Sequence, residues 1–269
     1  MLSMIGPSTL RSTVDAAGCR LFAICLLLCA SLTLGQTKID PARETLQQTG
    51  KIPILVISGN DTFHRWKETT PQLRTILEEG GRFETRLVED VYILESAAAL
   101  SRYKAIILNQ QVPKSTPEMR RNLERYVRSG GGLIAIHWAI DNFQDWPEFV
   151  NLIGRRWKEG SSGEEHGTFA VKVGDRTHPI GRKLNDFQTA EEDAVHYDLS
   201  GDAKVQVIAT AYLPEAGRDV PVAYAYQPDK GRVFFTSLGH SKVTRDSPGF
   251  RELISRAVEW AATGDVQEK

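Results

Sequence analysis

The sequence predicts an α/β fold in which a single doubly wound, mostly parallel sheet carries helices on both faces. From Lys51 onwards, short apolar runs rich in β-branched residues alternate with longer segments whose apolar residues recur at helical spacing. A parallel strand needs a crossover from its neighbour, so this alternation favours β-α-β units. No linker, repeat or low-complexity run interrupts the pattern after Lys51, which indicates one domain.

The first β-α-β unit is the clearest. Residues 52–57 (IPILVI) form an apolar, β-branched run that stops at the turn formers 58–61 (SGND). The triplet 69–71 (TTP) predicts the start of a helix, and Gly80-Gly81 predicts its end. Residues 83–88 alternate in polarity and form the second expected strand.

The next unit repeats this order. Residues 105–108 (AIIL) form the third expected strand, and 115–118 (STPE) predict a helix start, with the cap residue before the proline. That helix ends at the glycines 130–132. The fourth expected strand, 133–136, runs directly into His137-Trp138.

The second half of the chain is less regular. Four further strands are expected, followed by a closing helix over residues 250–262. The strands cover 169–173, 205–211, 221–226 and 232–236.

The N-terminal segment is expected to lie outside the fold. Arg20 precedes an uncharged apolar run, 21–34, that is shorter than the roughly 20 residues a membrane-spanning helix needs. We interpret 1–35 as a signal peptide, 36–50 as a polar N-terminal segment and 51–265 as the domain. This predicts an exported protein, periplasmic or extracellular, without stable membrane insertion after cleavage; an uncleaved membrane anchor is the alternative.

Charge and cysteine content exclude several classes of function. The chain has 33 Lys+Arg against 34 Asp+Glu, a formal net charge of -1, so it lacks the basic field that nucleic-acid binding requires. All three cysteines, Cys19, Cys25 and Cys29, lie in or before the apolar run. The mature chain therefore has neither disulfides nor a thiol nucleophile.

Three histidines follow separate expected strands. His64 comes after the first strand, His137 after the fourth and His240 after the strand 232–236. The carboxyl ends of strands in an open α/β sheet are where ligands bind, so these side chains are expected to converge. Imidazole titrates near neutrality and binds zinc and similar ions. Each histidine taken singly could equally be structural, but their shared position favours a site.

The other histidines are less specific. His178 precedes a proline, so it either binds a ligand or shapes a turn. His166 ends a polar, glycine-rich stretch, 159–166, that is either a flap or a surface loop. His196 follows the acidic run 191–193 and could add an acid or base to the pocket, although acidic runs are more often solvated.

Five ordered motifs resemble the ThuA-like (trehalose utilisation) family over about residues 51–263. They are VISG at 56–59 with His64 and Trp66, YVRSGGGLIAIH at 126–137, WPEF at 146–149 leading to Ile153-Gly154, THPI at 177–180, and GRVFFTSLGHS at 231–241. The resemblance implies a class I glutamine amidotransferase-like fold, which has a flavodoxin-like sheet. It also implies a role in carbohydrate catabolism on keto-sugars.

The sequence departs from its implied relatives at two places. Amidotransferase relatives have a cysteine nucleophile after the fourth strand, whereas this chain has His137, so thiolate chemistry is unavailable. Family members usually carry an Asp-Glu-Leu-Tyr-like segment, whereas this chain reads EEDAVHY at 191–197. Glu192 or Asp193 is the candidate carboxylate.

These observations predict an exported carbohydrate-processing enzyme of keto-sugar lyase, isomerase or hydrolase type, using histidine and carboxylate acid–base chemistry on a small sugar. A divalent metal, zinc or manganese, is a further hypothesis. The candidate residues are His137, His240, Glu192 and Asp193 as catalytic, His64, Trp66, Trp138, His178 and Ser241 as substrate-binding, and His64, His137 and His240 as metal ligands. The alternatives are a non-catalytic sugar-binding protein on the same fold and a hydrolase with paired carboxylates. Homo-oligomerisation is left open.

Overall fold

The computed structural model describes residues 50–59, 64–112, 114–190 and 193–268. All of them belong to one compact unit, Glu44–Lys269. The predicted signal peptide, 1–35, lies outside the described residues, as do residues 36–49 of the predicted polar segment and the candidate Glu192. Within the described part of the chain, no helix combines the length and apolar character that crossing a membrane requires.

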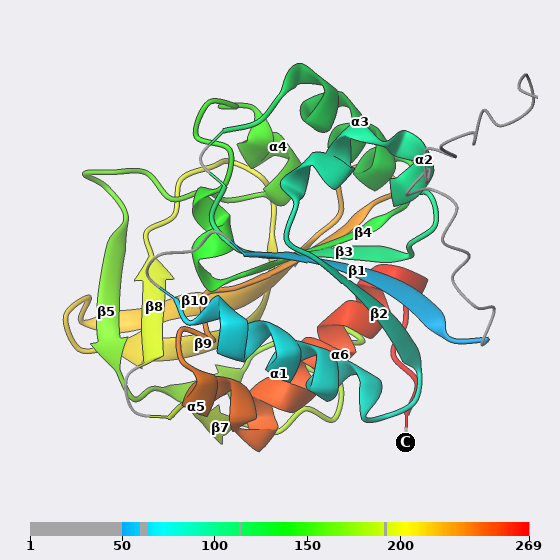
Figure 1. Cartoon of the computed structure of the whole chain (residues 1–269). Helices are drawn as coiled ribbons and strands as arrows, with labels where there is room; N and C mark the ends of the chain where they lie inside the picture. The colour runs from blue at the N-terminus through cyan, green and yellow to red at the C-terminus, as the bar shows by residue number, and fades with distance from the viewer. Residues whose placement is uncertain (1–49, 60–63, 113, 191–192, 269) are drawn as a thin grey trace, which may run out of the picture. The chain divides into compact units, whose positions relative to one another are not determined.

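A nine-stranded sheet forms the centre of the domain, in the order β2-β1-β3-β4-β11-β10-β9-β6-β7 (Figure 1). Its first five strands are parallel: β2 (Phe83–Val88), β1 (Ile52–Ser58), β3 (Ala105–Asn109), β4 (Gly132–Ile136) and β11 (Arg232–Thr236). The other four are antiparallel: β10 (Arg218–Tyr226), β9 (Gln206–Leu213), β6 (Ala170–Val173) and β7 (Phe187–Gln188). The predicted doubly wound α/β sheet is confirmed, with an antiparallel extension at one edge.

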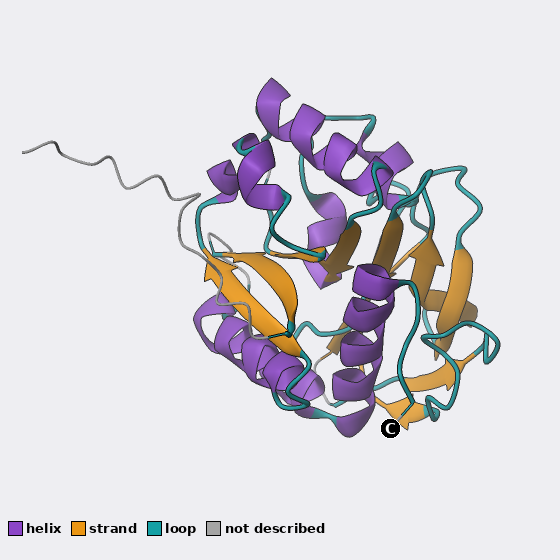
Figure 2. Ribbon diagram, turned by 90° about the vertical axis from the view of Figure 1, so that its right-hand side faces the viewer, coloured by secondary structure: helices purple, strands orange, loops and turns teal. Residues whose placement is uncertain are grey.

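Helices cover both faces of this sheet, as Figure 2 shows. One face carries α1 (Trp66–Glu78), α5 (Lys242–Asp246) and α6 (Pro248–Thr263), and the other carries η2 (Val91–Glu95), α2 (Ala97–Leu100), α3 (Pro117–Arg128) and α4 (Phe149–Ile153). Successive residues of β4 point to opposite faces, so Leu133 packs in one core and Ile134 in the other. Strands buried on both faces explain the continuous apolar runs in the sequence.

Gly132, at the start of β4, allows α6 to pack directly on the sheet. A Cβ atom there would lie 2.6 Å from the carbonyl oxygen of Ala261 and 2.9 Å from the Cβ of Ala105. Any side chain at this position would force the helix away from the strand. The glycines that follow α3 therefore end that helix and also leave room for α6 to pack on the sheet.

The start of α3 agrees with its sequence signal, whereas the start of α1 does not. The Thr116 hydroxyl accepts a hydrogen bond from the backbone N–H of Met119 and caps α3. Helix α1 begins at Trp66, so the predicted start at 69–71 is wrong and Pro71 lies inside the helix. The buried Thr70, directly before Pro71, hydrogen bonds to Ser58 at the end of β1.

A second, two-stranded sheet is formed by β5 (Gly163–Gly167) and β8 (Asp193–Tyr197). The polar, glycine-rich sequence of the β5 segment predicts a flap or a surface loop. Pairing with β8 makes it a strand, and Glu164 lies opposite His196. This small sheet stands beside β10 in Figure 1.

Candidate functional site

His137 lies at a strained turn between β4 and the short helix η3 (His137–Asp141). Its φ is +52°, a conformation that residues other than glycine adopt rarely and at an energetic cost. Its side chain is 2% exposed. Strain of this kind at the carboxyl end of a central strand is typical of a functional site.

Two contacts fix the imidazole of His137. Its Nδ1 lies 2.7 Å from the carbonyl oxygen of Ser237, so Nδ1 carries the proton and donates. Its Nε2 lies 3.0 Å from Nδ1 of His240. The lone pair of His137 Nε2 therefore faces the other imidazoles.

The loop that carries His240 is held from two sides. The carboxylate of Asp193 accepts hydrogen bonds from the backbone N–H groups of His240 (2.9 Å) and Gly239 (3.2 Å). The guanidinium Nε of Arg245 donates to the carbonyl oxygen of Gly239 at 2.8 Å. Gly239 has φ +96°, and a Cβ atom there would lie 2.8 Å from the ring of Phe250.

Asp193 is fully buried, and burial raises the pKa of its carboxyl to about 6. The sequence predicts this residue as a proton acceptor. Its hydrogen bonds in the structure run to the loop backbone, so they position His240. The acid–base role stays a prediction.

His64 completes the predicted triad. Its ring centroid lies 4.8 Å from that of His137 and 4.9 Å from that of His240. One nitrogen from each of the three rings lies within 4.8 Å of the others. The structure thus brings together the three histidines that the sequence places after separate strands.

A very small cavity adjoins this triad. It measures about 10 Å³, and its lining includes His64, His137, Trp66, Asn109 and Arg245. A volume of this size is close to the lower limit for one water molecule. The predicted contact residue Trp66 therefore lies beside the triad, but the cavity there does not accommodate a sugar ring.

His196, on β8, lies against the triad of His64, His137 and His240 and forms with it what we call the histidine cluster. Its ring centroid lies 4.5 Å from that of His137, and the ring stacks on Trp138 at 4.5 Å with an interplanar angle of 15°. The side chain is fully buried, yet neither ring nitrogen has a hydrogen-bond partner within the described residues. Its Nε2 lies 3.6 Å from Oε1 of Glu164.

Strand β5 contributes Glu164 and His166 from the same face, two residues apart. The ring of His166 lies 5.6 Å from that of His240. Five of the six histidines in the chain thus gather at this site. The sequence analysis assigns no role to Glu164. The signal that could have found it is its two-residue spacing from His166, which places both side chains on one face of a strand.

Three imidazoles of the cluster resist protonation, and its carboxylate resists neutralisation. Burial, with the neighbouring histidines, lowers the pKa of His137 well below its usual value. Burial also lowers the pKa of His196 and of His240. The imidazole of His196 lowers the pKa of Glu164. At neutral pH the lone pairs of these three imidazoles are therefore available to a metal or a proton donor.

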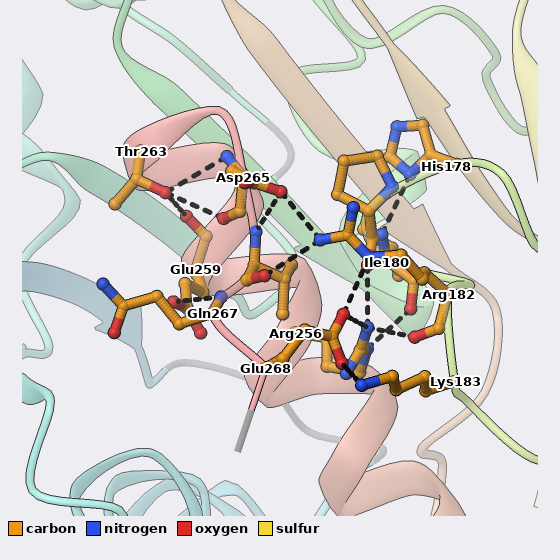
Figure 3. A network of polar contacts seen from close by, with 12 residues as sticks. His178, Ile180, Arg182, Lys183, Arg256, Glu259, Thr263, Asp265, Gln267 and Glu268 are labelled. Carbon is orange, nitrogen blue, oxygen red and sulfur yellow. Dashed lines mark hydrogen bonds and ion pairs between the residues drawn. The ribbon is translucent and has the colours of Figure 1, made fainter.

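Two other candidate residues have local structural contacts. Ser241 accepts a hydrogen bond from the backbone N–H of Thr244 and caps α5. The ring of His178 packs on Trp260 of α6, and its Nδ1 accepts from the N–H of Ile180. Figure 3 shows His178 beside the polar network at the end of α6. That part of α6 packs at the amino end of β4, whereas His137 follows the carboxyl end, so the structure does not bring His178 to the cluster.

The cluster offers two sets of metal ligands that share His137. One is His64, His137 and His240, and the other is His137, Glu164 and His196. Nitrogens bound to one tetrahedral zinc at about 2.0–2.1 Å lie roughly 3.3 Å apart, close to the separation of His137 Nε2 and His240 Nδ1. If the all-histidine set held an ion, Glu164 and His196 would not be among its ligands.

Comparison with known proteins gave one family match: the family described as "ThuA: Trehalose utilisation" matches residues 53–261. A ThuA-like protein from Parabacteroides merdae is similar in structure, with a TM-score of 0.73, 26% identity, and coverage of 81% of this chain and 92% of that chain. One from Bacteroides uniformis has a TM-score of 0.64, 20% identity, and coverage of 80% and 92%. No curated protein matched.

The same fold recurs inside larger enzymes. A β-galactosidase from Bacillus circulans has a TM-score of 0.55 and 13% identity, over 78% of this chain and 31% of that chain. At this identity the likeness concerns the fold alone.

We expect the substitution His196→Phe to stabilise the chelator-treated protein. Phenylalanine keeps the stack on Trp138 and removes two buried nitrogens that make no hydrogen bond, at the loss of the 3.6 Å contact between Nε2 and Glu164 Oε1, so the free energy of unfolding should rise by about 1 kcal/mol at pH 7.5. The gain should widen as the pH falls from 7 to 5. The unfolded wild-type chain takes up a proton near pH 6.5, whereas the folded chain, in which the pKa of His196 is lowered, resists protonation.

Urea unfolding of both proteins at several pH values measures this effect. His178→Phe is the matched control, because His178 accepts a hydrogen bond from Ile180 and its loss should destabilise the fold. A His196→Phe protein less stable than wild type at every pH would contradict the interpretation.

Proposed function

The chain belongs to the ThuA (trehalose utilisation) family, and from this premise we propose that it is an exported enzyme acting on a sugar or keto-sugar derivative. Histidine and carboxylate acid–base chemistry carries the reaction, assisted by a divalent metal. The partner is a small neutral molecule; the chain has no charge excess for nucleic acid. Export rests on the signal-peptide character of residues 1–35.

The convergence of five histidines is the single observation that carries this proposal. A lone buried histidine is readily explained by packing, but His196 is buried with no hydrogen bond within the described residues, and its Nε2 faces only the Glu164 carboxylate at 3.6 Å, at a cost to stability. His137 is held at a positive φ. Both of these unfavourable features lie at the carboxyl end of the parallel strands, where α/β proteins bind ligands.

The residues present fit a metal ion. His64, His137 and His240 would hold zinc or manganese through ring nitrogens, and the Ser237 carbonyl orients His137 as an outer hydrogen-bond partner. When bound, the ion would polarise a sugar carbonyl or hydroxyl oxygen. Asp193 keeps His240 in place through the loop backbone.

Glu164 is the carboxylate best placed to accept a proton. Its Oε1 lies 3.6 Å from Nε2 of His196 and 3.3 Å from Nε2 of His166, and the imidazole of His196 keeps its pKa low. We assign proton transfer to the Glu164–His196 pair. Glu192 lies outside the described residues, and the hydrogen bonds of Asp193 run to the backbone.

We expect the purified protein to contain close to one equivalent of zinc or manganese, and the double variant His64→Ala/His137→Asn to contain little. Asparagine is chosen at position 137 because it tolerates positive φ better than alanine. Elemental analysis of both proteins after incubation with each metal measures the difference.

The variant His178→Asn is the matched control for this experiment. It removes the one histidine outside the cluster and keeps an acceptor for the Ile180 N–H, so its metal content should equal that of wild type. Wild-type protein that takes up neither metal would refute the metal proposal and leave plain acid–base catalysis or sugar binding without turnover.

We expect the wild-type protein to consume at least one member of a panel of disaccharides and their keto derivatives. His137→Asn removes a ligand of the proposed metal, so it should lower turnover by at least about 100-fold and retain most of the binding. Chromatography follows consumption, and calorimetry follows binding. Binding without consumption would establish the alternative, a non-catalytic sugar-binding protein on this fold.

Persistence of turnover in chelator and in His137→Asn, with loss in Glu192→Gln or Asp193→Asn, would instead favour a hydrolase with paired carboxylates.

A further inference from the structure

The small sheet of β5 and β8 carries three side chains that can ligate a metal, all on one face. Glu164 and His166 lie two residues apart on β5, so both point to the same side of the strand. His196 lies directly opposite Glu164 on β8 and points to that side as well. The two strands stand side by side in Figure 1. One carboxylate and two imidazoles therefore converge without any member of the triad.

The carboxylate lies between the two imidazoles. Oε1 of Glu164 is 3.3 Å from Nε2 of His166 and 3.6 Å from Nε2 of His196. Ligand atoms bound to one tetrahedral zinc at roughly 2.0–2.2 Å lie roughly 3.3–3.6 Å apart, so both separations match those around a shared ion. Two imidazoles with one carboxylate also form a ligand set that zinc accepts.

His196 is the fixed ligand of this set. Its ring is fully buried, stacks on Trp138 and meets Trp157 edge-on at 5.4 Å. Its nitrogens make no hydrogen bond within the described residues, so an ion at Nε2 would satisfy a buried polar atom. Burial lowers the pKa of His196, and the imidazole of His196 lowers the pKa of Glu164. At neutral pH both side chains therefore hold the charge state that binds a metal.

His166 opens the set to solvent. Its side chain is 59% exposed, against 30% for Glu164 and 0% for His196. His166 and His196 are diagonal neighbours across the two strands, a separation that long side chains bridge, and the exposed ring can turn toward an ion. Ordering this exposed ligand costs conformational entropy, and an ion in the nearby triad repels a second cation. A metal here is therefore held more weakly than one in the triad.

We propose that Glu164, His166 and His196 bind a second zinc ion, more weakly than the triad binds the first, and that this ion inhibits turnover. The inhibition rests on the proposed function, in which Glu164 accepts a proton. A carboxylate oxygen that is coordinated to zinc no longer serves as a general base. Gel filtration removes the weakly held ion, so the purified protein keeps close to one equivalent.

Equilibrium dialysis of the metal-depleted protein against chelator-buffered zinc tests the proposal. The wild-type protein should bind two equivalents, the second with a dissociation constant at least about tenfold higher. His166→Ala and Glu164→Gln should each weaken only the second step, by more than about 100-fold, because loss of an outer partner alone weakens metal binding by about 10–100-fold. His166 is exposed, so its variant should fold normally.

Matched controls are His178→Asn, which changes a histidine away from this face and keeps an acceptor for the Ile180 N–H, and Glu159→Gln, at an exposed loop position. Both should bind two equivalents with wild-type affinities. The proposal is overturned if no bound equivalent is lost from His166→Ala and Glu164→Gln, because zinc that survives in both is adventitious.

Turnover at increasing zinc concentration tests the inhibition, on a sugar that the protein consumes. The rate should rise as the first ion binds and fall by at least about 100-fold as the second binds, since a general base typically contributes that much. In His166→Ala the fall should require far more zinc. A wild-type rate that stays constant while the second site fills would overturn the inhibition.

The double variant His64→Ala/His240→Ala separates this inference from the proposed function. It should bind one equivalent of zinc, which is lost when His166→Ala is added. If no sugar is consumed, the proposed function and the inhibition fail together, and this equivalent still supports the second site. Wild-type turnover that persists at saturating zinc, with zinc in the triad alone, refutes the inference and leaves the proposed function intact.

Discussion

The hydrogen bond from His137 Nδ1 to the Ser237 carbonyl oxygen is the contact on which the site depends. It joins the residues that directly follow two neighbouring parallel strands, β4 and β11, whose register pairs Ile136 with Thr236. Because the sheet fixes that register, it also fixes which nitrogen of His137 faces His240. A slip of one residue would turn the side chains of either strand to opposite faces and separate the two histidines.

Several features around this contact reduce stability locally, and the core compensates for them. His137 adopts a positive φ, His196 is buried without a hydrogen bond within the described residues, and Asp193 is a buried carboxylate with a raised pKa. The first two are arrangements that packing alone would disfavour, by roughly 1–3 kcal/mol each. They occur together at one end of a sheet whose strands are otherwise buried in well-packed apolar cores. Packing alone does not explain why these unfavourable arrangements occur together, so we infer that this end of the sheet has a functional role.

The sequence predicted those parts of the fold and site that follow from local patterns. Polar residues directly after apolar strands placed His64, His137 and His240 at one edge, because the carboxyl ends of parallel strands meet there. The same approach missed β5, since a strand that pairs only with β8 needs no apolar run, and with it missed Glu164. His178 had a similar local signal, but its position depends on packing against Trp260, a long-range contact that local patterns do not encode.

Zinc titration of the ¹⁵N-histidine-labelled protein, followed by NMR of the imidazole nitrogens, tests whether the histidine cluster binds a metal. We expect zinc to shift the signals of His137 Nε2 and His240 Nδ1, while His137 Nδ1 stays protonated against the Ser237 carbonyl and the His178 signals do not change. Unchanged His137 and His240 signals at saturating zinc, or equal shifts at His178, would contradict a metal site built on this cluster.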